Sequence, residues 1–96
     1  MNELIHKLTL KYGISINVLS KLTNITTVTM YKYAKNHQGD ASNELLLRLL
    51  LNPTNFYYIY NINKHKIDKI NCMKIEDNLK FKLAEMKLTE IKTIII

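Results

Sequence analysis

The side chains that most often perform catalysis or hold metal ions are few in this chain and are scattered along it. The three histidines are His6, His37 and His65, and the single cysteine, Cys72, follows the last of them by seven residues. No pair among them has the spacing of metal ligands. With only two glycines the chain has no glycine-rich phosphate loop, and no serine, histidine and carboxylates are arranged for catalysis. The sequence therefore predicts a protein that is not an enzyme and that has no metal or cofactor.

A different chemistry is concentrated in residues 4–39, where hydroxyl groups and lysines occur without any acid. The lysines of this region are Lys7, Lys11, Lys21, Lys32 and Lys35. The whole chain has 14 basic and 8 acidic residues, a net charge of +6, but 13 of the basic residues are lysines, a bias that is also typical of AT-rich genomes. The position of the charges is therefore more informative than their sum. A surface that carries only positive charge favours an anionic partner such as nucleic acid.

Length and composition indicate one domain with enough apolar residues to form a core. The chain has 96 residues, 47% of them hydrophobic. A single cysteine excludes an internal disulfide and fits a reducing compartment. We find no apolar stretch long enough to span a bilayer and no apolar region of a signal peptide at the N-terminus. We expect a cytoplasmic protein without a membrane partner.

Apolar spacing and capping residues predict successive helices in the first part of the chain. The first helix has a natural stop at Gly13, which can adopt the left-handed conformation. Ser15 is the expected cap of a short second helix. Asn24 tolerates the left-handed conformation of a turn, and Thr26 is the expected cap of a third helix that runs to about Lys35.

Further helices are predicted after the polar loop that follows. Ser42 is the expected cap of a fourth helix, whose nearly continuous leucines suggest that other helices surround it. Pro53 stands at a first helical position and opens a fifth helix, although the β-branched and aromatic residues of 56–62 leave a strand as an alternative. A sixth helix is predicted from about Glu76, where acids favour a helix N-terminus, after a basic connector.

The second and third predicted helices, joined by a tight turn, form a helix-turn-helix arrangement. In ISINVLSKLTNITTVTMYKY (residues 14–33), Ser20 is small where the helices cross and Asn24 stands at the turn. The residues spaced to face the core are Ile25, Met30 and Tyr33. This pattern resembles the Cro/phage-repressor (XRE-type) family of helix-turn-helix DNA-binding proteins. Where the family commonly has glycine at the turn this chain has Asn24, and where it often has glutamine the chain has Ile16.

The resemblance implies a fold and a division of the chain. We expect an all-α protein, with a five-helix phage-repressor-like helix-turn-helix domain in residues 1–62. A basic connector would occupy residues 63–75, with a ragged helix there as the alternative, and a C-terminal helical extension would occupy residues 76–96. The extension is a candidate dimerisation element, because a five-helix domain does not need its apolar residues. The alternative is that it packs back on its own domain.

The resemblance also implies which residues would meet DNA. In this family the second helix of the motif, here about residues 27–35, lies in the major groove. Threonine hydroxyls can bond base edges, and a valine can contact a thymine methyl group. The expected base-contacting residues are Thr26, Thr27, Val28, Tyr31 and Lys32. The expected phosphate-contacting residues are Ser15, Asn17, Lys35, Asn36, His37 and Gln38. Four of these have an alternative role: Thr26 would serve as a helix cap, Val28 would be partly buried, Tyr31 would pack on a neighbour or a partner protein, and Lys35 would be solvated.

The function implied by the resemblance is that of a small sequence-specific DNA-binding transcriptional regulator. It would be repressor-like, belong to a phage or mobile element, and bind double-stranded DNA as a homodimer through its C-terminal region. The alternative is a protein-binding helix-turn-helix module, such as a phage-encoded anti-CRISPR-like inhibitor of a host nuclease or defence complex. In that case the tyrosines of residues 57–60 and the basic residues after them would form the functional surface.

Overall fold

The structure is a computed structural model that describes residues 1–35 and 38–95, with side chains described up to residue 86. This part of the chain is all-helical and contains no strand, so the predicted all-α class is confirmed. The α-helices are α1 (Asn2–Tyr12), α2 (Ile16–Thr23), α3 (Thr27–Ala34), α4 (Ala41–Leu49), α5 (Pro53–Asn63) and α6 (Lys69–Ile95). A short 3-10 helix, η1 (Lys64–Lys66), precedes α6. The strand alternative for residues 56–62 is wrong, because that segment lies within α5.

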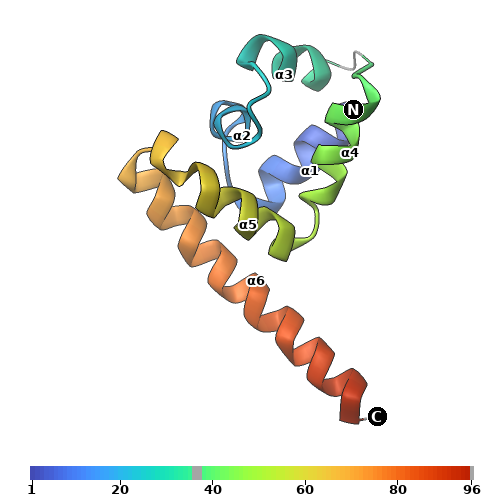
Figure 1. The fold of residues 1–96 in the computed structure, drawn as a ribbon, viewed down its shortest axis with the longest axis vertical. Coiled ribbons are helices and arrows are strands. Elements are labelled where there is room, and N and C mark those ends of the chain that lie inside the picture. The colour runs from blue at the N-terminus through green and yellow to red at the C-terminus, as the bar shows by residue number, and fades with distance from the viewer. Residues whose placement is uncertain (36–37, 96) are drawn as a thin grey trace.

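The helices are arranged so that α3 lies at one end of an elongated molecule. Figure 1 shows α1, α2, α4 and α5 in the middle and α6 leading away toward the opposite end. The principal extents are 46 × 30 × 20 Å. Helix α3 packs against α1 and α2 and presents its other side outward. The fold therefore supports α3 from one side only.

Most of the predicted helix boundaries are confirmed by the cap geometry. Gly13 follows α1 in the left-handed conformation, with φ 60° and ψ 39°. The Ser15 hydroxyl accepts a hydrogen bond from the Val18 N–H at 3.2 Å, which satisfies one free donor at the start of α2. The prediction that Ser42 caps α4 is wrong, because α4 begins one residue before it. Asp40 is the cap instead, and its carboxylate accepts from the Asn43 N–H at 2.8 Å.

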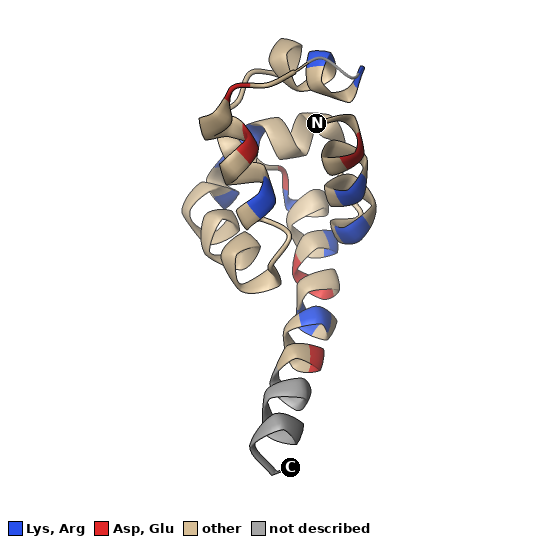
Figure 2. Ribbon diagram, turned by 90° about the vertical axis from the view of Figure 1, so that its right-hand side faces the viewer, with Lys and Arg blue, Asp and Glu red and all other residues tan. Residues whose placement is uncertain are grey.

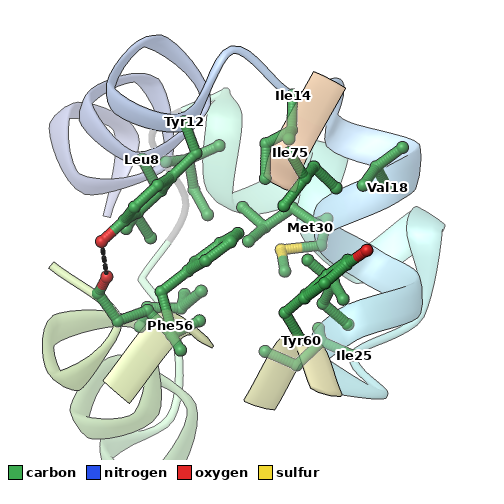
Figure 3. Packing of buried hydrophobic residues seen from close by; sticks show 14 of the residues in the cluster. Leu8, Tyr12, Ile14, Val18, Ile25, Met30, Phe56, Tyr60 and Ile75 are labelled. Atoms are coloured by element: carbon green, nitrogen blue, oxygen red, sulfur yellow. Dashed lines mark hydrogen bonds between the residues drawn. The ribbon is translucent and has the colours of Figure 1, made fainter. Parts of the chain in front are cut away.

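The core is built around two stacked aromatic rings. Tyr12 and Phe56 lie with ring centroids 3.7 Å apart and planes inclined by 14°. The Tyr12 hydroxyl donates to the Leu50 carbonyl at 2.5 Å, which joins α1 to the end of α4. Figure 3 shows Met30 of α3 and Tyr60 of α5 reaching into the same cluster. Burial raises the pKa of the Tyr12 phenol above its usual range.

The prediction that other helices surround α4 is wrong. Leu47 is the one fully buried residue of this helix, whereas Leu45 is 60% and Leu49 is 50% exposed. Helix α4 lies at the edge of the molecule, beside α1 (Figure 1). A run of leucines therefore marks a helix with one buried face and a second apolar face left at the surface.

Helix α6 begins earlier than predicted. It starts at Lys69 rather than near Glu76, so residues 63–75 are not a connector along their whole length, and the alternative of a helix in this segment is confirmed from Lys69 onward. The carboxylate of Asp68 accepts from the Asn71 N–H at 2.8 Å and from its side-chain amide at 2.9 Å. These hydrogen bonds lower the pKa of the Asp68 carboxyl. The acids at residues 76 and 77 lie inside the helix, not at its start.

The first half of α6 belongs to the core. Ile75 and Leu79 are each 1% exposed, and α6 packs against α5 and α1. The alternative, that the C-terminal extension packs back on its own domain, is therefore confirmed for the first turns of the extension, which include Leu79. None of the described helices combines the length and the apolar composition that crossing a membrane requires.

Candidate nucleic-acid interface

The turn between α2 and α3 is held by backbone geometry and by two buried hydroxyls. Asn24 has φ 60° and ψ 14°, the left-handed conformation that its sequence position predicted. The Ser20 hydroxyl donates to the Ile25 carbonyl, and the Thr23 hydroxyl accepts from the Ile25 N–H at 3.3 Å. Both polar groups of Ile25 are therefore satisfied where the chain reverses. The short, satisfied turn fixes the direction in which α3 leaves α2.

Helix α3 is anchored by a small apolar set on its inner face. Ile25 is 6%, Met30 0% and Tyr33 5% exposed, as predicted for the core half of the motif. Ser20 is 7% exposed and is small enough for α3 to approach α2 closely. The Tyr33 hydroxyl accepts from the Asn43 side-chain amide at 2.9 Å, which ties the C-terminal end of α3 to α4.

The outer face of α3 carries the groups that the sequence assigned to base contacts. Val28 is 67% and Tyr31 44% exposed, and Thr27 and Lys32 are exposed as well. The alternative of a partly buried Val28 is therefore wrong. In Figure 2, α3 carries a blue Lys segment and no red acidic segment. This face offers an apolar group, a phenol and an ammonium group without a carboxylate on the same helix.

The threonine hydroxyls at the start of α3 are partly engaged inside the protein. Thr26 accepts from the Thr29 N–H at 3.3 Å and donates to the Thr29 hydroxyl at 2.8 Å. Its predicted role as a helix cap is confirmed. The Thr27 hydroxyl lies 3.3 Å from that of Ser20. The exposed side chains of α3 that take part in none of these hydrogen bonds are Val28, Tyr31 and Lys32.

The predicted phosphate-contacting residues lie at two places around α3. Ser15 and Asn17 are exposed at the N-terminal end of α2, where backbone N–H groups are available to an anion. Lys35 follows the last turn of α3, and Gln38 is exposed in the loop before α4. The two other predicted contacts, at residues 36 and 37, lie outside the described residues.

Two residues that the sequence did not single out, one at the end of α5 and one in η1, brace the turn. The Asn63 side-chain amide donates to the Leu22 carbonyl at 3.0 Å, and Asn63 is buried. The Lys66 ammonium donates to the side-chain oxygen of Asn24 at 2.5 Å. These partners are separated by 41 and 42 residues, so neither apolar periodicity nor a local motif signals them.

In the described part of the chain, no group of three or more histidine, cysteine or carboxylate side chains is placed to hold a metal ion. Comparisons with models of protein families, with curated proteins and with solved structures give no match for this chain.

Proposed function

We propose that the α2–α3 pair is a DNA-binding helix-turn-helix of the phage-repressor type and that the protein is a small transcriptional regulator. The observation that carries the proposal is the outer face of α3. It is exposed, free of acids and held from behind by Met30 and Tyr33. A helix of this kind fits a major groove, which is about 12 Å wide. The regulator would belong to a phage or mobile element and act in the cytoplasm.

Within α3 the proposed roles follow from the chemistry of each side chain. Val28 would contact a thymine methyl group, and the Tyr31 hydroxyl and Lys32 would meet acceptors on base edges or phosphates. Lys35 would meet a phosphate, because a flexible ammonium without a planar fork is better suited to that interaction. Thr26 would act mainly by capping α3 and so by positioning these groups.

The test is binding to duplex DNA from the region upstream of the protein's own gene. We expect a gel shift whose affinity falls as the salt concentration rises. The variant Lys32→Ala/Lys35→Ala should reduce the slope of log K against log salt by about 0.9 for each phosphate that these lysines neutralise in the parent protein. Lys74→Ala/Lys80→Ala on α6 removes the same charge elsewhere and is the control. The absence of a shift at low salt, or an equal effect of both double variants, would refute the proposal.

We also propose that the protein binds DNA as a homodimer through its C-terminal region, residues 76–96. Phe81 is 72% exposed on α6, and Met73, about one turn before the proposed region, is 65% exposed. Sedimentation of the full chain at micromolar concentration should give a dimer. Phe81→Lys should weaken it, whereas Lys80→Ala beside it should not. A monomer at every concentration would contradict the dimer and leave DNA binding to be judged separately.

One observation favours the alternative of a protein-binding module. Leu49 and Tyr58 are exposed and border a hollow of about 210 Å³ between α4 and α5. Aromatic and apolar residues of this kind are enriched at the centre of protein interfaces. Under this alternative, nuclease-treated extract should yield one specific host protein, and Tyr58→Lys should abolish its capture. Recovery of nucleic acid alone would contradict it.

A further inference from the structure

The segment that follows α5 places the basic side chain of Lys66 beside the turn of the α2–α3 pair. Helix η1 packs against α2, and the Lys66 ammonium lies 2.5 Å from the side-chain oxygen of Asn24. Lys64 and Lys69, on either side of Lys66 along the chain, are exposed. Residues 42 positions apart in the sequence are thus brought together near the start of α3.

Lys21 belongs to the same group. It lies in the last turn of α2, is exposed, and is close enough to Asp68 to favour the ionised carboxylate. We define the turn-side basic cluster by four residues: Lys21, Lys64, Lys66 and Lys69. Asp68 is the acid among them, and both of its oxygens accept hydrogen bonds from Asn71. The cluster therefore keeps a clear excess of positive charge.

The turn-side basic cluster and the lysines Lys32 and Lys35 lie at opposite ends of α3. The turn precedes the N-terminal end of α3, whereas Lys32 and Lys35 are at its C-terminal end. Eight residues of α-helix span about 12 Å. The major groove of B-DNA has a similar width and is bordered by two phosphate backbones. A helix seated there with cations at both ends can meet both borders.

We propose that the turn-side basic cluster is a second phosphate-contacting surface for double-stranded DNA, on the other border of the groove from Lys32 and Lys35. This inference rests on the proposed DNA binding and adds a surface supplied by the chain after α5. Lys66 has two roles in it, because it braces Asn24 and also contributes charge. Lys64 and Lys69 are the better residues to test, since replacing them leaves the Lys66–Asn24 hydrogen bond in place.

The experiment measures the affinity of the full chain for the upstream duplex, and for an unrelated duplex of equal length, over a range of salt concentrations. The variant Lys64→Gln/Lys69→Gln removes two charges and keeps polar side chains. If both lysines meet phosphates, the slope of log K against log salt should fall by about 1.8. Near 0.1 M salt the affinity for both duplexes should fall by about 10-fold to 100-fold, because phosphate contacts do not read sequence.

Two matched variants make the result specific. Lys64→Arg/Lys69→Arg keeps the charge and should retain the salt slope. Lys74→Gln/Lys80→Gln removes two charges further along α6 and should leave the slope unchanged. Thermal unfolding followed by circular dichroism should show all variants folded like the parent.

The possible failures are distinguishable. If the parent protein binds DNA and Lys32→Ala/Lys35→Ala weakens it, but Lys64→Gln/Lys69→Gln leaves the slope unchanged, the second surface is refuted and the proposed function stands. If the control on α6 lowers the slope equally, the effect is one of net charge and the second surface is again refuted. If the parent protein binds neither duplex at low salt, the proposed function fails and the inference fails with it.

Discussion

The conformation of Asn24 gives the most direct test of how the turn is held. This residue has φ 60°, where the Cβ of an ordinary L-residue is crowded by the following carbonyl. Asn24→Ala should destabilise the protein by about 1–2 kcal/mol, because alanine incurs this steric penalty and has no side-chain oxygen for Lys66. Asn24→Gly removes the Cβ. Removing the steric crowding stabilises the folded state, but glycine has greater freedom in the unfolded chain, and the two effects oppose each other. The stability of Asn24→Gly should therefore stay within about 1 kcal/mol of the parent.

The pair can be compared by urea unfolding followed through the helical circular dichroism signal. For a domain of this size, Asn24→Ala should lower the urea midpoint by about 1 M relative to Asn24→Gly. Both variants lack the hydrogen bond to Lys66, so their difference reports the steric penalty of alanine less the entropic cost of glycine in the unfolded chain. Equal midpoints would refute the reasoning, because they would mean that the steric penalty at this turn does not exceed the entropic cost of glycine.

Three further predictions concern the core and the caps. Met30→Ala should lower the free energy of unfolding by about 2–5 kcal/mol in a urea titration, since Met30 is fully buried behind α3. Thr26→Ala should reduce thermal stability by about 1 kcal/mol through loss of the α3 cap, whereas Thr26→Ser should retain it; an equal loss in both would contradict the cap. Burial raises the pKa of Tyr12, so its phenol stays neutral in the folded state while the unfolded chain ionises above about pH 10. The contribution of Tyr12 to stability should therefore be constant below that pH and decrease above it, so the fall in the protein's stability above about pH 10 should be smaller in Tyr12→Phe.

The positions of the first five helices could be predicted because each carries a local signal. Gly13, Ser15 and Asn24 act through the conformation or the hydrogen bond of a single residue and its near neighbours. The inner face of α3 was equally readable, because Met30 and Tyr33 are separated by three residues and so lie on one side of a helix. The residues of α3 that do not share this spacing were assigned to its outer face. Val28 is one of them, and the sequence alone left its exposure open.

The incorrect predictions concern features that depend on distant contacts or on competing caps. Leu45 and Leu49 are apolar, but their burial depends on whether another helix covers their side of α4, and none does in the described part of the chain. The start of α6 was missed because its first turns are rich in polar and basic residues, and Asp68 was not recognised as the cap. At α4, Asp40 was the stronger cap because its side chain reaches the Asn43 N–H directly. The exposure of Leu45 and Leu49 therefore depends on tertiary structure, whereas the caps at Asp40 and Asp68 are local.

The hydrogen bond from Asn63 to Leu22 decides where the protein can be cut for engineering. A fragment that ended at residue 62 would keep all of α2 and α3 but leave the buried Leu22 carbonyl without its donor. It would also lack Ile75 and Leu79, which fill the core from α6. A minimal version of the domain therefore requires the chain to continue through η1 to at least Leu79.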